Sequence, residues 1–370
     1  RRFFLFLTVL FFSTLNVAGD EGVVQQIYVG TFTSEGAEGI YLCSFDPQTG
    51  EIKLNETFKG VHNPSFLKIS PNRKYLYSVN RAPKNIESAG GYVTAYEINK
   101  NGSLKFLNNQ LSHGSGPCHI DVSGDGKFVA IATYGGGTVS LYPVTENGGL
   151  AEATTVIQNR GSGANKRRQE GPHAHCVKFS PYNNQVFNAD LGTDQLNVLL
   201  LKNNKLIRQD SVEMAAGAGP RHFNFHPNEQ VIYVINELNS TITAVGNVEG
   251  NWKKFQTVST LPPDFTGDNS CADIHVSADG KFLYGSNRGH NSIAVFEIDP
   301  HNKHLTFIKT VSTEGDWPRN FTISPDGNYL LVANQRSGNI AVFQIEKDSG
   351  IPEFTGNQVK LPAPVCLEFY

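Results

Sequence analysis

The sequence predicts an all-β protein, a seven-bladed β-propeller whose blades are four-stranded and antiparallel. Three observations predict this fold. The 370-residue composition, with 36 Gly, 18 Pro, 24 Phe and 13 Tyr but only one Met, suits short strands joined by tight turns. One strand–turn–strand unit recurs roughly every 50 residues, which is the length of a propeller blade. The two ends of the chain also carry complementary parts of one further unit.

The repeat is clearest at residues 219–237, where an alternating apolar strand, a polar turn and a second strand rich in Val, Ile and Tyr follow one another. The same pattern begins at Pro64, Pro117, Pro172, Cys271 and Pro318, and a half-copy begins at Pro364. The turns are expected at residues 277–280 and 324–327, which read Ser-Ala-Asp-Gly and Ser-Pro-Asp-Gly. Each unit therefore begins with a β-hairpin.

Further strands follow each hairpin. Residues 91–98 and 340–345 alternate as third strands, and residues 305–311 alternate as a fourth. A chain of two β-sandwich domains would not explain equal units, and a β-helix needs shorter rungs. Four antiparallel strands per repeat is the prediction that remains.

The ends of the chain should close the ring. Residues 364–369 supply only a first strand, whereas residues 27–31 resemble a second strand with no first strand before it. Pairing these two segments in one blade removes the open edge that a linear array would leave. We therefore expect a propeller domain over residues 26–370.

The N-terminal segment predicts export. Arg1 and Arg2 precede an apolar stretch at residues 3–12, and small residues follow at 17–19, so residues 1–19 are interpreted as a signal peptide. The two arginines also resemble the twin-arginine export pattern. We expect a periplasmic or secreted protein that is not membrane-bound after the signal is removed.

Charge and motifs narrow the partners. A net charge of −3 from 31 basic and 34 acidic residues makes nucleic acid an unsuitable partner, and the basic run at residues 166–168 is interpreted as a solvated loop. Five cysteines without C-x-x-C spacing predict neither a disulfide framework nor a zinc site. The chain has no phosphate-binding loop and no serine nucleophile elbow. We expect no cofactor.

The hairpin geometry predicts where polar residues converge. Because the strands of a hairpin are antiparallel, the start of the first strand lies beside the end of the second, so Arg221 and Glu237 should be neighbours at one face of the ring. The other blades should bring to this face a set of polar residues: Asn80, Arg81, His173, His175, Asp190, His222, Asp273, Arg288, Arg319 and Gln335. We call this concave face the funnel and predict that it holds the functional site.

Two other interpretations of these residues stay open. Arg221 and Glu237 could form a purely structural ion pair at the channel mouth. His173 and His175 form an H-x-H pair that could bind a metal with Asp190, Glu237 or Asp273, although no third ligand has a clear spacing. A hydrogen-bonding or catalytic role for the histidines is the third possibility, and we assign no metal ligand.

At these residues the chain resembles the lactonase family of seven-bladed propellers, which includes 6-phosphogluconolactonases and carboxymuconate cyclases. The resemblance covers about residues 26–370. It rests on four stretches: Tyr-Val-Gly-Thr-Phe-Thr at 28–33 with Gly-Ile-Tyr at 39–41, Gln-Glu-Gly-Pro-His-Ala-His at 169–175, Gly-Pro-Arg-His at 219–222, and Asn-Glu-Leu-Asn-Ser at 236–240. It implies functional positions at His173, Arg221, Glu237 and Arg288.

The resemblance implies a hydrolase that opens a small sugar lactone of the 6-phosphogluconolactone type by water attack in the funnel. Ester hydrolysis needs a base, which could be Glu237 or His173, and cations that hold the substrate anion and the oxyanion, for which Arg221 and Arg288 are candidates. We expect five further residues to bind or orient the substrate: His175, His222, Asp273, Arg319 and Gln335. The alternatives are a lactone-forming cycloisomerase and a non-catalytic ligand- or protein-binding propeller. A cytoplasmic phosphorylated lactone would conflict with export.

Overall fold

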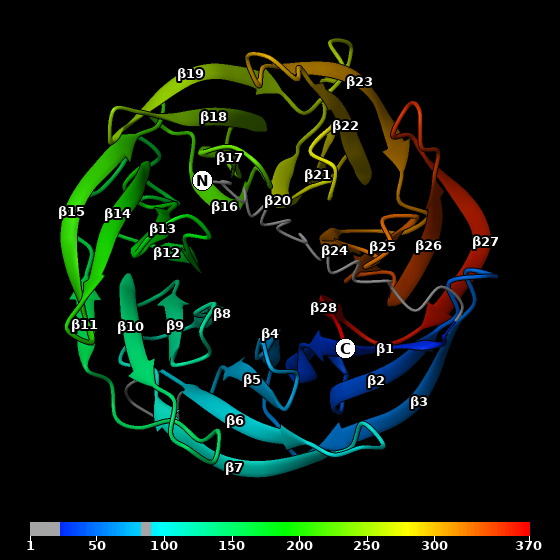
Figure 1. Ribbon diagram of the computed structural model, residues 1–370. Helices are drawn as coiled ribbons and strands as arrows, with labels where there is room; N and C mark the ends of the chain where they lie inside the picture. The colour runs from blue at the N-terminus through cyan, green and yellow to red at the C-terminus, as the bar shows by residue number, and fades with distance from the viewer. Residues whose placement is uncertain (1–22, 83–89) are drawn as a thin grey trace, which may run out of the picture.

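The computed structural model describes residues 23–82 and 90–370, and Figure 1 shows their strands arranged as a closed ring of blades around a central channel. The predicted signal peptide lies outside the described residues. Seven antiparallel sheets of four strands each account for the described chain. The predicted fold is therefore confirmed.

We number the blades from the first complete repeat. Blade 1 contains β4 (Pro64–Ile69), β5 (Tyr75–Asn80), β6 (Tyr92–Ile98) and β7 (Leu104–Leu111). Blade 2 contains β8 (Pro117–Val122), β9 (Phe128–Thr133), β10 (Thr138–Pro143) and β11 (Thr155–Gln158). Blade 3 contains β12 (Ala174–Phe179), β13 (Gln185–Asp190), β14 (Gln195–Lys202) and β15 (Lys205–Glu213). Blade 4 contains β16 (Pro220–Phe225), β17 (Val231–Asn236), β18 (Thr241–Val248) and β19 (Asn251–Ser259).

The remaining blades complete the ring. Blade 5 contains β20 (Ser270–Val276), β21 (Phe282–Arg288), β22 (Ser292–Ile298) and β23 (Leu305–Ser312). Blade 6 contains β24 (Pro318–Ile323), β25 (Tyr329–Asn334), β26 (Asn339–Ile345) and β27 (Pro352–Lys360). Blade 7 joins β28 (Pro364–Phe369) to β1 (Gln25–Thr31), β2 (Gly39–Phe45) and β3 (Ile52–Lys59). A short 3₁₀ turn, η1 (Thr33–Glu35), follows β1.

The ring closes through blade 7, as the terminal half-units predicted. Val29 of β1 lies opposite Leu367 of β28 in an antiparallel ladder. In Figure 1 the red C-terminal strand lies against the blue N-terminal strand at the inner side of the ring. Because the last strand is hydrogen-bonded to the first, the array has no open end.

The hydrophobic core lies between the blades. Seven large clusters of buried side chains occur in the described chain, and each draws its members from two neighbouring blades. Second strands such as β13, β17 and β25 are buried at every position because a blade packs against each of their faces. The outer strands β15 and β19 face water and are largely polar. Each blade therefore depends on its neighbours for most of its burial.

Two kinds of side-chain bond repeat around the ring. Tyrosine hydroxyls on second strands donate to a turn of the next blade, from Tyr28 to the Gly102 carbonyl at 2.6 Å and from Tyr284 to the Gly350 carbonyl at 2.8 Å. At the channel, side chains of one blade accept hydrogen bonds from backbone N–H groups on the first strand of the next blade. For example, the Ile69 N–H donates to the Glu368 carboxylate at 3.0 Å. These bonds satisfy backbone groups on the inner edge of each blade, where no further strand pairs with the first strand.

Candidate active site in the funnel

A β-bulge lies near the start of the first strand in every blade. The hydrogen-bond register skips one residue between Pro220 and His222, and again between Pro318 and Asn320. The skipped residues are Arg221 and Arg319. A bulge turns the extra side chain out of the normal alternation. The seven bulges contribute a set of equivalent positions: Ser65, Cys118, His175, Arg221, Ala272 with Asp273, Arg319 and Val365.

A second set of equivalent positions lies where the second strand ends. In blade 4 this residue is Glu237, whose N–H donates to the Gly219 carbonyl at 2.7 Å, and in blade 6 it is Gln335, whose N–H donates to the Trp317 carbonyl at 3.0 Å. The equivalent residues around the ring are Phe32, Arg81, Tyr134, Leu191, Glu237, Arg288 and Gln335. These residues and the bulge residues together form the funnel that the hairpin geometry predicted.

Glu237 is the anionic centre of the funnel. Its Oε2 lies 3.0 Å from Arg221 Nε and 2.9 Å from Arg288 Nη2, and its Oε1 lies 2.5 Å from Arg168 Nη2. The predicted neighbours Arg221 and Glu237 are thus in contact. Burial opposes ionisation of Glu237, but the three guanidinium groups outweigh it and lower the pKa of the carboxyl to about 2. Glu237 is therefore ionised at neutral pH.

Backbone carbonyls use further N–H groups of the two deeper arginines. Arg221 donates to the Ala272 carbonyl at 2.5 Å, and Arg288 donates to the Cys271 carbonyl at 2.7 Å and the Ser270 carbonyl at 3.3 Å. Burial and repulsion from Arg288 lower the pKa of Arg221 to about 10. These contacts fix both guanidinium groups at the centre of the funnel.

His173 lies beside this cluster at the entrance to β12. Its Nδ1 is 2.8 Å from the Tyr134 carbonyl oxygen, and its ring stacks on the Tyr134 ring at 4.3 Å with an interplanar angle of 7°. Nδ1–H must donate to this carbonyl, so the neutral imidazole carries its lone pair on Nε2. Nε2 is 3.3 Å from Oε1 of the exposed Glu170 and makes no hydrogen bond among the described residues.

Asp190 does not face the funnel opening, contrary to expectation. Its Oδ1 accepts the backbone N–H groups of His173, Gly192 and Thr193, and its Oδ2 accepts an N–H of Asn159. The carboxylate is fully buried and holds the chain in place before β12. Asp190 therefore positions His173 through its backbone N–H.

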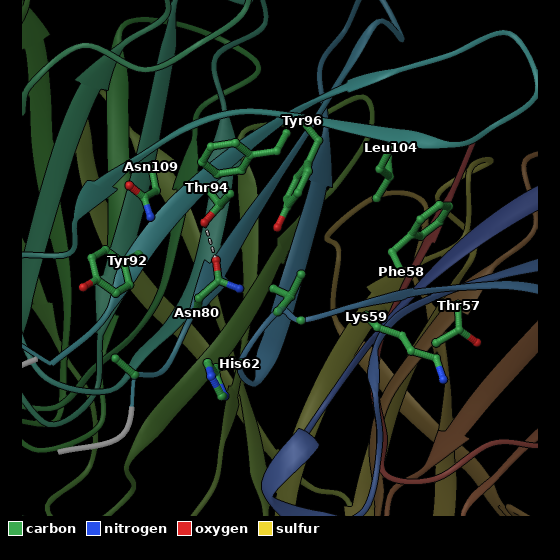
Figure 2. A pocket seen from close by; sticks show the side chains of 14 residues that line it. Thr57, Phe58, Lys59, His62, Asn80, Tyr92, Thr94, Tyr96, Leu104 and Asn109 are labelled. Atoms are coloured by element: carbon green, nitrogen blue, oxygen red, sulfur yellow. Dashed lines mark hydrogen bonds between the residues drawn. The ribbon is translucent and has the colours of Figure 1, made fainter. Parts of the chain in front are cut away.

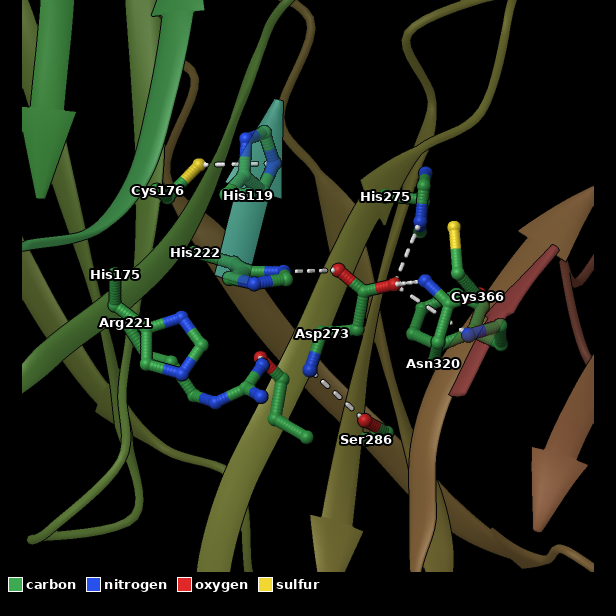
Figure 3. Close-up of polar contacts among 12 residues, drawn as sticks. His119, His175, Cys176, Arg221, His222, Asp273, His275, Ser286, Asn320 and Cys366 are labelled. Atoms are coloured by element: carbon green, nitrogen blue, oxygen red, sulfur yellow. Dashed lines mark hydrogen bonds and ion pairs between the residues drawn. The ribbon is translucent and has the colours of Figure 1, made fainter. Parts of the chain in front are cut away.

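Figure 3 shows a second group of polar contacts, which we call the second polar layer. His222 Nδ1 is 2.7 Å from Asp273 Oδ1, while Asp273 Oδ2 accepts from Asn320 at 2.5 Å and lies 3.1 Å from His275 Nε2. Burial and Arg221 lower the pKa of His222 to about 3. The predicted residues His222 and Asp273 thus join blades 4, 5 and 6.

The other predicted substrate-binding residues occupy different parts of the funnel. The His175 ring lies edge-on to Tyr134, with centroids 5.7 Å apart, and 5.2 Å from the His222 ring, so it joins the two layers. Arg319 lies over Phe32, with 5.1 Å from its guanidinium carbon to the ring centroid. Gln335 donates to both carboxylate oxygens of Glu35 on η1 at 3.0 and 2.8 Å.

Two residues that contact Glu237 or His173 were not predicted. Arg168 belongs to the basic run interpreted as a solvated loop; Lys166 and Arg167 are exposed as that interpretation requires, but the Arg168 guanidinium contacts Glu237. The repeating strand pattern of the sequence does not predict a contact made by a loop. Tyr134 could have been found, because it occupies the position in blade 2 that Glu237 occupies in blade 4.

A separate cavity lies away from the funnel. It has a volume of about 610 Å³ between the outer parts of blades 7 and 1, and Figure 2 shows Phe58, Tyr96 and Leu104 around it. Asn80, predicted to face the funnel, lines this cavity and accepts a hydrogen bond from Thr94 at 2.7 Å. None of the residues discussed as catalytic lines it.

Two further features are absent from the described residues. Over residues 23–82 and 90–370, no group of three or more His, Cys, Asp or Glu side chains is arranged to hold a metal ion. The same residues contain no helix long and apolar enough to cross a membrane.

Comparison with known proteins places the chain in a family. Residues 26–369 match the family described as "Lactonase, 7-bladed beta-propeller". The chain is 39% identical to the 6-phosphogluconolactonase of Bacillus subtilis over 345 residues, covering 92% of this chain and 97% of that protein. It is 38% identical to the 6-phosphogluconolactonase of Formosa agariphila, covering 80% and 86% of the two chains.

A solved structure supports the same assignment. The periplasmic gluconolactonase PpgL of Pseudomonas aeruginosa superimposes with a TM-score of 0.88 at 30% identity, covering 94% of this chain and 99% of that one. The ring closure, the repeated bulges and these matches across nearly the whole chain agree. The chain belongs to the lactonase family of seven-bladed β-propellers.

Proposed function

We propose that the protein hydrolyses the ester bond of a sugar lactone of the 6-phosphogluconolactone type in the funnel. The observation that carries this proposal is the placement of His173 in the same funnel as two buried arginines around one carboxylate; its Nε2 makes no hydrogen bond among the described residues and lies 3.3 Å from the exposed Glu170 carboxylate. Relatives named 6-phosphogluconolactonase or gluconolactonase match most of the length of this chain.

His173 is the base in this proposal, and Glu237 is not. A carboxyl with a pKa of about 2 is a weak proton acceptor at neutral pH, and three guanidinium groups surround its oxygens. His173 has its tautomer set by the Tyr134 carbonyl, which leaves Nε2 to take the proton from the attacking water. Glu237 instead keeps Arg221 and Arg288 in place.

The reaction then proceeds in two steps. Water loses a proton to His173 Nε2 while its oxygen bonds to the lactone carbonyl carbon, and the remaining N–H groups of Arg221 and Arg288 stabilise the oxyanion. The ring C–O bond then breaks, and the proton on His173 passes to the leaving alkoxide oxygen. The product is the open-chain hydroxy acid.

The test is lactone opening by the wild-type protein and by His173→Gln, with the spontaneous rate subtracted. The variant should lower kcat by roughly 10²- to 10⁴-fold if His173 is the base. Exposed His301 gives a matched control, His301→Gln, which should keep wild-type rates. Near-normal turnover by His173→Gln would refute this role. Formation of a lactone from a carboxylated diene would instead indicate the cycloisomerase, and binding without turnover would indicate a non-catalytic propeller.

We also propose that the protein is exported and loses residues 1–19. The support is the basic and apolar N-terminal sequence, together with the similarity to the periplasmic gluconolactonase of Pseudomonas aeruginosa. Cell fractionation followed by N-terminal sequencing tests this. A full-length cytoplasmic protein with its N-terminal arginines intact would contradict it.

A further inference from the structure

Two arginines of the funnel have no carboxylate partner among residues 23–82 and 90–370. Arg319 makes no ion pair or side-chain hydrogen bond among the described residues, and Nε of Arg81 is buried without a hydrogen-bond partner. Arg168, Arg221 and Arg288 all contact Glu237. Around blade 4, three arginines therefore share one carboxylate, whereas Arg81 and Arg319, from blades 1 and 6, contact no carboxylate among the described residues.

The internal repeat explains why Arg319 lacks a partner. Arg319 occupies the bulge position in blade 6 that Arg221 occupies in blade 4, and Gln335 occupies the position of Glu237. An uncharged amide thus replaces the carboxylate. The Gln335 Nε2 group donates to Glu35, and its Oε1 is buried without a partner.

Arg81 and Arg319 both lie over the ring of Phe32. The guanidinium carbons of Arg319 and Arg81 are 5.1 and 5.3 Å from the centroid of the buried Phe32 ring, so they lie within about twice that distance of each other. A contact with an aromatic face does not supply the negative charge that a carboxylate partner would. Burial and the neighbouring arginines lower the pKa of Arg319 well below its usual value.

Arg221 and Arg288 already share one carboxylate and donate to backbone carbonyls of blade 5. Their remaining N–H groups can stabilise the single charge of an oxyanion, but a dianionic phosphate placed there would be repelled more strongly by the Glu237 carboxylate. Arg81 and Arg319 contact no carboxylate among the described residues, so their guanidinium N–H groups suit a dianion better.

We propose that Arg81 and Arg319, which both lie over Phe32, form the subsite for the phosphate monoester of a phosphorylated sugar lactone. This inference rests on the proposed lactonase function and assigns the phosphate to blades 6 and 1, across the funnel from Glu237. The phosphate would provide the negative charge that a carboxylate at position 335 would otherwise provide to Arg319. The lactone ring then lies between this subsite and His173.

The kinetic test compares 6-phosphogluconolactone with gluconolactone. Arg319→Gln and Arg81→Gln should each raise KM for the phosphorylated lactone on the order of 10- to 100-fold, because each removes a charge-assisted hydrogen bond. KM for gluconolactone should change less than about 2-fold. Arg319→Lys keeps the charge and should recover part of the affinity. The control Arg73→Gln removes an exposed arginine in the turn between β4 and β5, at the far end of the hairpin, and should change neither KM. Equal changes for the two lactones, or none for either, would overturn the proposal.

A binding test separates this subsite from the catalytic proposal. Inorganic phosphate titrated into the wild-type protein by calorimetry should bind, and the double variant Arg81→Gln/Arg319→Gln should lose that binding while keeping its near-ultraviolet circular dichroism. Acetate at the same ionic strength tests a carboxylate ligand, and tighter binding of acetate than of phosphate would overturn the phosphate assignment. If the wild-type protein opened no lactone but bound phosphate through these arginines, the lactonase proposal would fail and the anion subsite would stand. No phosphate binding by the wild-type protein would overturn the subsite.

Discussion

Replacing Glu237 with Gln should reveal how much of the stability depends on the buried ion cluster. The folded-state pKa of about 2 compares with an ordinary value of 4.5, so the carboxylate favours the folded state. A shift of this size corresponds to about 3 kcal/mol. Because the folded pKa is lowered, this stabilisation is fully present above about pH 4.5 and is lost as the pH falls towards 2.

The Glu237→Gln variant keeps the shape of the side chain and removes the charge. At pH 7 it should be less stable by roughly 3–5 kcal/mol, because three guanidinium groups lose their common partner. The measurement is urea unfolding followed by tryptophan fluorescence at several pH values between 7 and 2.5. The difference in the free energy of unfolding between variant and wild type should shrink as the pH falls below about 4.5.

The matched control is Glu229→Gln, which removes an exposed carboxylate that lies 3.9 Å from Lys303. It should cost less than about 1 kcal/mol at every pH. A Glu237→Gln difference that stays constant from pH 7 to 2.5 would refute the reasoning, because it would show that the arginines do not hold the carboxyl ionised in the folded state.

Three other changes test the scaffold of the site. Gly192→Ala would place a Cβ 1.9 Å from the Gly171 carbonyl oxygen and 2.8 Å from His173 N. We therefore expect a lower kcat and a free energy of unfolding that is lower by about 1–3 kcal/mol. The control Gly124→Ala, which has open space around its Cβ, should change neither quantity. Tyr284→Phe removes the hydroxyl that binds the Gly350 carbonyl and should cost about 1 kcal/mol by urea unfolding, and an unchanged midpoint would contradict a role for this bond. Deleting residues 364–370 removes β28 and opens the ring, so the truncated chain should lose cooperative thermal unfolding in calorimetry, and a sharp transition at the wild-type temperature would count against closure as a source of stability.

Much of the fold could be predicted from local patterns. Strand alternation and turn residues recur in each unit, and both depend on the backbone within a few residues. The turn at residues 324–327 has Ser324 bonded to Asp326 and Gly327 at a φ of 75°, as its sequence indicates. The contact between Arg221 and Glu237 was also predictable, because two antiparallel strands of known register fix which residues are neighbours.

The contacts across blades could not be predicted in the same way. Arg168 reaches Glu237 from a loop, and loop conformation depends on packing against distant segments rather than on a repeating pattern. Gln335 and Arg319 repeat the positions of Glu237 and Arg221, yet the amide turns to Glu35 of blade 7 because the closed ring brings η1 beside it.

The sequence by itself determined seven units, their closure by the chain ends, and the funnel face on which the polar residues gather. Those properties follow from hydrogen bonding and burial within one repeat and its neighbour. Only the tertiary structure decided the other charge contacts. Glu237 also contacts Arg168 and Arg288, whereas Arg81 and Arg319 contact no acid among the described residues, because these contacts depend on side chains that come from separate blades and loops.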